Sequence, residues 1–122
     1  MRLEIERAEI IYVLTHTLSN LQLTGSHWFG GVTDKSDMDF FTSDAADLTT
    51  LGFELVSIRG YADSVTIAVW RNMGLKIDVQ VVNSFDLKLK AQKILSLRGT
   101  LPTDKAERTD LWNAALALAA SI

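Results

Sequence analysis

Two aspartates separated by one residue, Asp37 and Asp39, carry the strongest chemical signal in the sequence. Residues 36–42 alternate, with Asp37 and Asp39 on one side and Met38 and Phe40 on the other, which is the period of a half-buried strand. Two carboxylates so placed project side by side and repel each other unless a cation lies between them, and hard cations such as Mg²⁺ prefer oxygen ligands. The pair therefore predicts a metal site.

A third acid, Asp78, lies in the β-rich run Leu75–Val82, which predicts a strand next to that of Asp39. The run alternates between an apolar and a polar face, formed by Ile77, Val79 and Val81 and by Lys76, Asp78 and Gln80, respectively. Asp78 would complete a two-ion site, in which one ion activates an attacking hydroxyl and the other binds a triphosphate and stabilises the leaving pyrophosphate. A strand acid paired with Lys76 is the alternative.

A Gly-Ser pair, Gly25 and Ser26, precedes the two aspartates within a glycine-rich stretch over residues 22–35. Its backbone N–H groups and hydroxyl can face phosphate oxygens, and glycine permits close approach to the main chain. A phosphate site would then adjoin the metal site.

Together these residues resemble the signature of the nucleotidyltransferases of the DNA polymerase beta superfamily. That signature is a Gly-Ser, then roughly ten residues, then Asp-hydrophobic-Asp-hydrophobic, here Asp37-Met38-Asp39-Phe40. Gly30 and Ser36 also match the fuller pattern of the minimal nucleotidyltransferases. The resemblance covers residues 24–82.

The resemblance implies roles for the matched residues. Gly25 and Ser26 would bind the phosphates of an NTP, with Ser36 in the same pattern. Asp37 and Asp39 would hold two Mg²⁺ or Mn²⁺ ions, while Asp78 would bind the catalytic ion and assist deprotonation of the acceptor.

The segment after the Gly-Ser departs from the family pattern. Minimal members often carry arginines there, whereas this chain has His27, Trp28 and Phe29. His27 could contact a phosphate or shuttle a proton, and a loop histidine without a role is the alternative. For Trp28 and Phe29, packing is favoured over stacking on a nucleobase.

The function implied is transfer of NMP, with AMP favoured, from NTP to a hydroxyl on a protein, RNA or small molecule. By analogy, the acceptor can be a partner toxin with a HEPN domain. Because the chain lacks the extra helical domain of larger members, a second copy in a homo-oligomer would supply part of the acceptor site. The alternative is a non-catalytic nucleotide-binding or antitoxin-like inhibitory module with the same fold.

A second group of charges lies in the helical stretch 84–98, which contains Lys88, Lys90, Lys93 and Arg98. These side chains could grip a triphosphate or RNA, although a solvated helix face is the commoner explanation. His16 is expected on a helix surface.

Composition sets the broad class of protein. The chain has 122 residues, 48% hydrophobic and 22% charged, which predicts one folded domain over residues 1–122. Without cysteine, any metal must be held by oxygen or imidazole. The net charge of −3 argues against broad nucleic-acid binding. The acidic start Met1–Glu6 and the short apolar run Leu111–Ile122 predict neither export nor a membrane span, so the expected location is cytoplasmic.

Periodicity predicts a mixed α/β (α+β) domain, with a single sheet flanked by helices. Helices are expected on one side of the sheet and a polar strip on the other. Helices are predicted over residues 3–21, 44–51 and 84–98, and from a capping box at Asp104–Glu107 to about Ala120. Strands are predicted over 36–42, Phe53–Arg59, Val65–Trp70 and Leu75–Val82, the last two forming a hairpin. Residues 22–35 are expected to form a loop with at most one helical turn.

Overall fold

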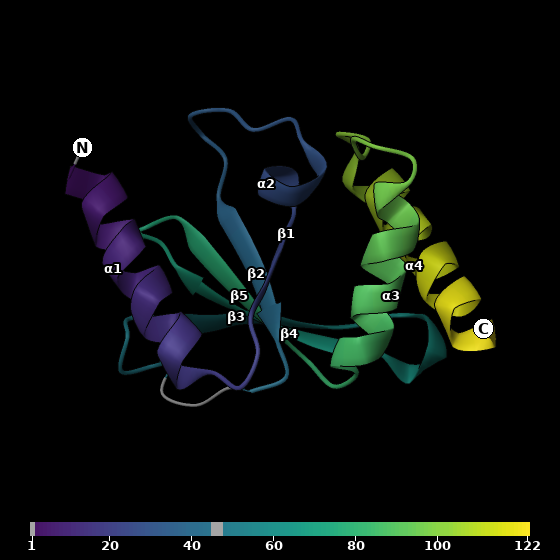
Figure 1. The fold of residues 1–122 in the computed structure, drawn as a ribbon, viewed down its shortest axis with the longest axis horizontal. Helices are drawn as coiled ribbons and strands as arrows, with labels where there is room; N and C mark the ends of the chain where they lie inside the picture. The colour runs from purple at the N-terminus through teal and green to yellow at the C-terminus, as the bar shows by residue number, and fades with distance from the viewer. Residues whose placement is uncertain (1, 45–47) are drawn as a thin grey trace.

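A five-stranded mixed sheet forms the centre of the protein (Figure 1). The computed structural model describes residues 2–44 and 48–122. Across the sheet the strands are β1 (Gln22–Thr24), β2 (Met38–Thr42), β5 (Ile77–Val82), β4 (Thr66–Asn72) and β3 (Glu54–Gly60). β2 and β5 are parallel, and the other neighbouring pairs are antiparallel. The predicted class, a single mixed sheet flanked by helices, is confirmed.

Helices cover both faces of the sheet rather than one. Helix α1 (Arg2–Thr17) packs on one face, and helices α3 (Phe85–Ser96) and α4 (Lys105–Ser121) pack on the other (Figure 1). Strand β2 shows why, because its consecutive residues Phe40 and Phe41 point to opposite faces and are both buried. Each face therefore needs an apolar cover.

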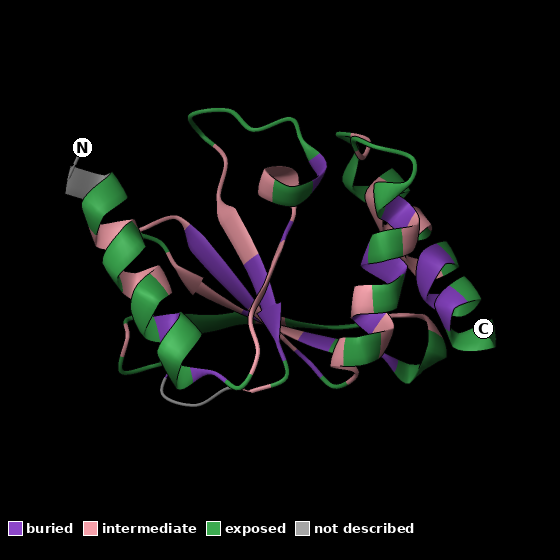
Figure 2. Cartoon of the chain, viewed as in Figure 1, coloured by how far each residue is buried: buried purple, intermediate pink, exposed green. Residues whose placement is uncertain are grey.

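Two separate hydrophobic cores result from this arrangement. Leu14 of α1 packs with Phe40, Ile77 and Val79 on one face. On the other face the core joins the sheet to α3 and α4, through Phe41, Ile67, Val69, Val82, Ala91, Leu95 and Leu116. Figure 2 shows buried residues on the central strands and on α3 and α4. The alternation predicted for Leu75–Val82 is confirmed, with its polar face turned toward α3 and α4.

The segment after α1 differs from the sequence prediction. The helix ends at Thr17 instead of continuing to residue 21, and β1 occupies the start of the predicted loop. Asn20 explains the early end, because its side-chain oxygen accepts hydrogen bonds from Thr42 Oγ1 at 3.1 Å and from the backbone N–H of Ser43 at 2.8 Å. These bonds tie the turn to the end of β2 and bring β1 alongside that strand.

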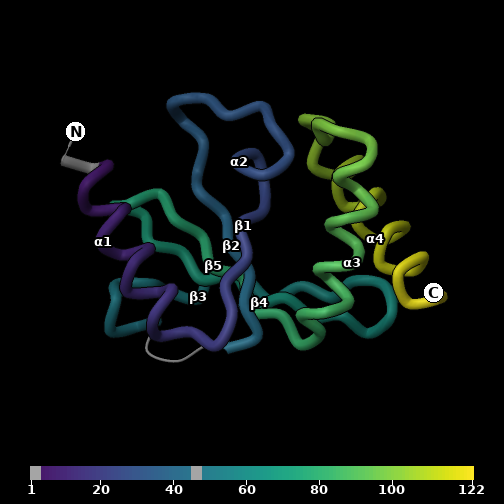
Figure 3. Tube along the Cα trace, viewed as in Figure 1, coloured from purple at the N-terminus to yellow at the C-terminus, as the bar shows by residue number. Residues whose placement is uncertain are grey.

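The segment that connects β1 to β2 contains the short helix α2 (Ser26–Phe29), which is the helical turn allowed by the sequence (Figure 3). Trp28 donates from Nε1 to Oγ of Ser96 at 2.9 Å, and Phe29 packs edge-on against Trp112 with the ring centroids 5.9 Å apart. Both aromatic residues therefore hold the segment between β1 and β2 against α3 and α4. Phe29 is buried in the core as predicted, whereas Trp28 is 45% exposed.

The remaining elements follow the sequence prediction in part. Of the helix predicted over 44–51, residues 45–47 lie outside the described residues, and residues 48–52 form turns. A 3₁₀ turn, η1 (Ala62–Ser64), joins β3 to β4 and was not predicted. The predicted cap of the last helix is confirmed, because Asp104 Oδ2 accepts from the N–H of Glu107 at 3.0 Å. Within residues 2–44 and 48–122, no helix is long and apolar enough to cross a membrane.

Candidate active site

Four residues of the site lie in one row across the sheet. Asp39 of β2 pairs in register with Asp78 of β5, with Thr24 of β1 and Arg71 of β4 as the outer neighbours of the pair. Residues in register on adjacent strands present their side chains on the same face of a sheet. Asp39 and Asp78 therefore point to the face covered by α3 and α4, and both line one cavity there.

Asp39 lies in an environment that disfavours its charge. Burial, together with the nearby Asp78 and Asp37, raises the pKa of this carboxyl from its ordinary value of 3.8 to about 7. The cations Arg71 and Lys88 act in the opposite direction but do not compensate. Three carboxylates thus influence one another, and added positive charge would stabilise the ionised form of Asp39.

Asp78 already has a cationic partner. Arg71 donates from Nε to Oδ1 at 2.8 Å and from Nη2 to Oδ2 at 3.0 Å, which is a two-pronged ion pair. The hydrogen bond and the charge of Asp78 raise the pKa of the Arg71 guanidinium. The alternative partner considered from sequence, Lys76, lies in the turn before β5 with a φ of 54°. Strand pairing, rather than spacing along the chain, decides the partner of Asp78.

The fit of these acids to a divalent ion is partial. Among residues 2–44 and 48–122, no three His, Cys, Asp or Glu side chains are grouped closely enough to form a metal site. Asp39 and Asp37 line a common cavity, whereas both oxygens of Asp78 are held by Arg71. Asp37 and Asp39 would hold an ion as they stand, and Asp78 would join them after release of, or sharing with, Arg71.

Gly25 brings the main chain against Asp39. Its φ of 68° and ψ of −155° favour glycine, and an added Cβ would overlap Oδ2 of Asp39 and lie 3.0 Å from its Cγ. The sequence predicts close approach of a phosphate at this position. The group that approaches Gly25 in the structure is the Asp39 carboxylate, so the glycine is needed to position that acid.

The other residues of the predicted phosphate loop are placed differently from one another. Ser26 and Ser36 line a cavity together with Gly25, Asp37 and Asp39. The Ser36 hydroxyl also closes its own loop, because it accepts from the backbone N–H of Thr33 at 2.8 Å.

His27 is not part of this lining. Its Nδ1 is buried without a hydrogen-bond partner among the described residues, and its side chain faces neither this cavity nor the one that holds Asp78. The structure therefore groups Ser26 and Ser36 with the acids but leaves His27 outside.

Two cavities meet at Gly25 and Asp39, and Leu101 and Arg108 also line both. The first cavity, of about 330 Å³, contains Asp39 and Asp78 and extends to α3 and α4. The second cavity, of about 410 Å³, contains Asp37, Ser26 and Ser36. Both volumes fall in the range of small-molecule sites. Asp39 faces both cavities and is the residue through which two ligands would meet.

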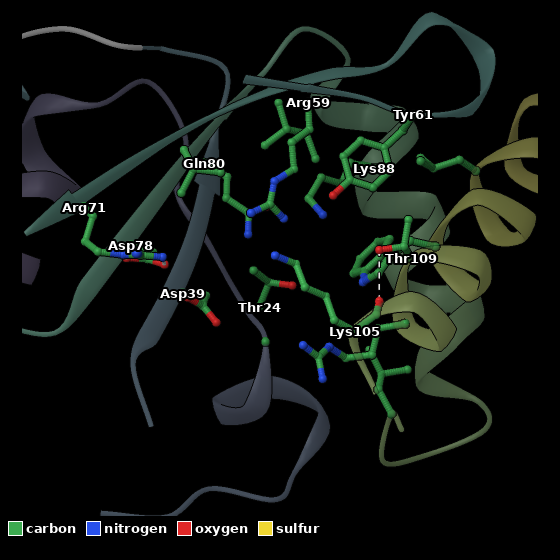
Figure 4. Close-up of a pocket in the computed structure, with 17 residues that line it drawn as sticks. Thr24, Asp39, Arg59, Tyr61, Arg71, Asp78, Gln80, Lys88, Lys105 and Thr109 are labelled. Carbon is green, nitrogen blue, oxygen red and sulfur yellow. Dashed lines mark hydrogen bonds and ion pairs between the residues drawn. The ribbon is translucent and has the colours of Figure 1, made fainter. Parts of the chain in front are cut away.

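The first cavity also has a basic wall, which we define as Arg59, Lys88, Lys105 and Arg108. Figure 4 shows Arg59, Lys88 and Lys105 directed into the cavity across from Asp39 and Asp78. Arg59 comes from β3, Lys88 from α3, and the other two residues from α4. These cations come from three separate elements, and sequence reasoning missed all of them except Lys88.

Lys88 differs from the other three cations of its stretch. It is buried with Ala91, Gln92 and Leu95, whereas Lys90, Lys93 and Arg98 are exposed. The sequence holds one signal for this difference: Lys88 occupies a position of the helical pattern that is otherwise apolar, which is not expected of a lysine on a solvated face. Burial lowers the pKa of Lys88 to about 7.

The resemblance to polymerase beta-like nucleotidyltransferases rests on the residues of the chain itself. Comparison with family models, with curated proteins and with solved structures gave no match. The function is therefore argued from the fold, the acids on β2 and β5, and the two cavities.

Proposed function

We propose that the protein is a metal-dependent nucleotidyltransferase, which moves NMP, with AMP favoured, from NTP to a hydroxyl acceptor. The observation that carries the proposal is the pairing of Asp39 with Asp78 on parallel strands, next to Asp37 and the Gly25 turn. A buried acid whose pKa is raised by burial and by neighbouring acids, as that of Asp39 is, is expensive for folding, and such groups are concentrated at functional sites.

The two cavities suggest how the substrates lie. The NTP occupies the second cavity, where Ser26 and Ser36 face its phosphates and Asp37 and Asp39 face its metal. The acceptor occupies the first cavity, beside Asp78. Asp39 is common to both cavities, so the α-phosphorus and the acceptor hydroxyl would meet at this residue.

The reaction is a single substitution at phosphorus. The acceptor oxygen forms a bond to the α-phosphorus while the bond from that phosphorus to the bridging oxygen of the β-phosphate breaks, and pyrophosphate leaves. The hydroxyl proton passes to the carboxylate pair of Asp39 and Asp78. Bound Mg²⁺ or Mn²⁺ ions, held by Asp37, Asp39 and Asp78, would lower the pKa of the hydroxyl and offset charge on the pyrophosphate.

A second candidate is favoured by one observation. The ion pair of Asp78 with Arg71 neutralises the acid that the family resemblance assigns to the catalytic ion. A chain that keeps this pair in its working state would bind nucleotide without turnover and act as an inhibitory module. A partner such as a HEPN-domain toxin and a homo-oligomer stay predictions under either candidate.

Label transfer tests the proposal. The purified chain is incubated with each α-labelled NTP, Mg²⁺ or Mn²⁺, and protein, RNA or small-molecule acceptors. We expect label on an acceptor with the wild type and none with Asp37→Ala or Asp39→Ala. Transfer should be unchanged with Asp34→Ala, which replaces an exposed acid in the segment between β1 and β2. Nucleotide binding without transfer under every condition would favour the inhibitory module.

A further inference from the structure

The first cavity gathers positive charge in a protein that is acidic as a whole. The chain has 12 Lys and Arg residues and a net charge of −3, yet five of these cations line this one cavity, namely Arg71 and the basic wall. Among the described residues, two carboxylates line the same cavity, Asp39 and Asp78. Arg71 forms an ion pair with Asp78. The four cations of the basic wall therefore exceed the remaining negative charge of the cavity, which is that of Asp39.

The cations of the basic wall are not paired with acids of the described chain. Arg59, Lys88 and Lys105 form no salt bridge with any residue of 2–44 or 48–122. Arg108 is fixed by donating to the backbone carbonyls of Pro102 and Thr103, which orient its guanidinium without neutralising it. Unpaired cations that converge in a cavity repel one another and favour a bound anion.

Lys88 is the most constrained of the four. Only 3% of its surface is exposed, and its ammonium lies 3.6 Å from the Trp112 ring centroid and 4.9 Å from that of Phe41. Lysine is rarely buried to this degree unless it is paired, and Lys88 forms no salt bridge with the described residues, although the charge of Asp39 acts on it. The two rings hold the ammonium in place, and a bound anion would stabilise its charged form.

The position of the basic wall decides which ligand it contacts. In the proposed function the NTP phosphates lie at the Gly25 and Ser26 turn in the second cavity, whereas Arg59, Lys88 and Lys105 line only the first cavity. Arg108 lines both cavities. Tyr61 and Trp112 also line the first cavity. A cavity of about 330 Å³ suits a small molecule.

We infer that the first cavity is an acceptor site for a phosphorylated small molecule, whose phosphate binds Arg59, Lys88, Lys105 and Arg108 while a free hydroxyl faces Asp39 and Asp78. This inference rests on the proposed function only in identifying the bound molecule as the acceptor. The site itself is independent of it, because an anion would bind the basic wall without NTP or metal.

Ribose 5-phosphate is the probe, because it carries a phosphate and hydroxyls but no base. Calorimetry without metal or NTP should show binding of ribose 5-phosphate and none of ribose. Arg59→Ala and Lys105→Ala, which alter exposed side chains, should each weaken binding about 10-fold, as expected for a lost charged hydrogen bond. Lys88→Met should weaken it at least as much. The controls Lys90→Ala and Lys93→Ala, on the exposed face of α3, should bind like the wild type.

Three results would overturn the inference. The first is no binding of ribose 5-phosphate at millimolar concentration, or equal binding of ribose. The second is competition with a non-hydrolysable ATP analogue in the presence of Mg²⁺, which would assign the basic wall to the triphosphate. The third is binding of only a 5′-phosphorylated oligonucleotide, which would assign it to RNA.

The two proposals fail in different ways. Binding of ribose 5-phosphate through the basic wall, without nucleotidyl transfer to any acceptor, would overturn the proposed function and leave the anion site standing. Transfer to an acceptor without phosphate, together with no binding of ribose 5-phosphate, would overturn this inference and leave the proposed function standing.

Discussion

The guanidinium of Arg71 grips the carboxylate of Asp78 through two hydrogen bonds of 2.8 and 3.0 Å between neighbouring strands. This pair gives Asp78 a counter-charge beside Asp39, whose own pKa is raised by the neighbouring acids. The same contact also occupies an acid that catalysis would need. The stability and the activity of Arg71 and Asp78 variants are therefore expected to separate.

Replacing Arg71 should destabilise the protein through Asp78. Arg71→Gln leaves a buried carboxylate without its counter-charge, and the expected loss of unfolding free energy is about 1–3 kcal/mol, reduced because the Arg71 side chain is 36% exposed. Urea unfolding of Arg71→Gln, Asp78→Asn and the double variant measures the coupling. Arg98→Gln, an exposed arginine, is the control. Additive effects of the two substitutions would show that the ion pair does not stabilise the fold.

Asp78 and Asp39 should differ in their effects on binding and turnover. Asp78→Asn is expected to keep the binding of Mg-NTP, because Asp78 lies in the first cavity only, and to lower single-turnover transfer by at least about 100-fold. Asp39→Asn should damage both, since Asp39 faces both cavities. Nucleotide titrations and single-turnover rates on the two variants check this. Transfer by Asp78→Asn at the wild-type rate would make Asp78 an ordinary strand acid.

Gly25 should tolerate no side chain. In Gly25→Ala the new methyl group would displace the Asp39 carboxylate, so the affinity for Mg-NTP should fall at least about 10-fold. Gly99→Ala is the matched control, because Gly99 also has a positive φ, of 90°, but open space around its Cβ position. Calorimetric titration compares the two. Equal affinity in Gly25→Ala and the wild type would count against the placement of the nucleotide next to Asp39.

The stability of the metal-free protein should fall as the pH rises from about 4 to about 7. The pKa of Asp39 is raised in the folded state to about 7 from 3.8, so in this window the folded state binds more protons than the unfolded state. The stabilisation is complete below 3.8 and is lost as the pH passes through about 7. Lys88 does not add to this pH dependence of the stability, because below about pH 7 it is protonated in both the folded and the unfolded state.

Asp39→Asn isolates this effect. In the presence of a chelator at pH 8, the variant should melt about 3–6 °C above the wild type, which is the shift produced by about 1 kcal/mol in a domain of this size. At pH 4 the difference should vanish. Addition of Mg²⁺ at pH 8 should raise the melting temperature of the wild type but not of Asp39→Asn. A wild type that melts no lower than the variant at pH 8 would contradict the buried, repelled state of Asp39.

Local pattern determined most of the elements and part of the site. The alternation along Leu75–Val82 predicts which side chains share a face, and the capping pattern at Asp104 predicts where α4 begins, because both depend on neighbours in sequence. The alternation also predicted Asp37 and Asp39 on one face of a strand, but β2 begins at Met38, so Asp37 lies just before the strand and meets Asp39 only at the second cavity. That Asp39 and Asp78 face the same cavity follows from the parallel pairing of β2 with β5, which the sequence predicts only as adjacency.

Tertiary structure alone decided which side chains contact one another in the site. The sequence offers Lys76 for Asp78, but strand register selects Arg71; the approach of β1 to β2 also sets the Asp39 carboxylate against Gly25, a contact that the sequence does not predict. The three-residue strand β1 has no pattern of its own and exists because β2 offers an open edge. The basic wall is spread over β3, α3 and α4, and only packing brings its cations together. Contacts between residues distant in sequence depend on register and packing, and no local period encodes them.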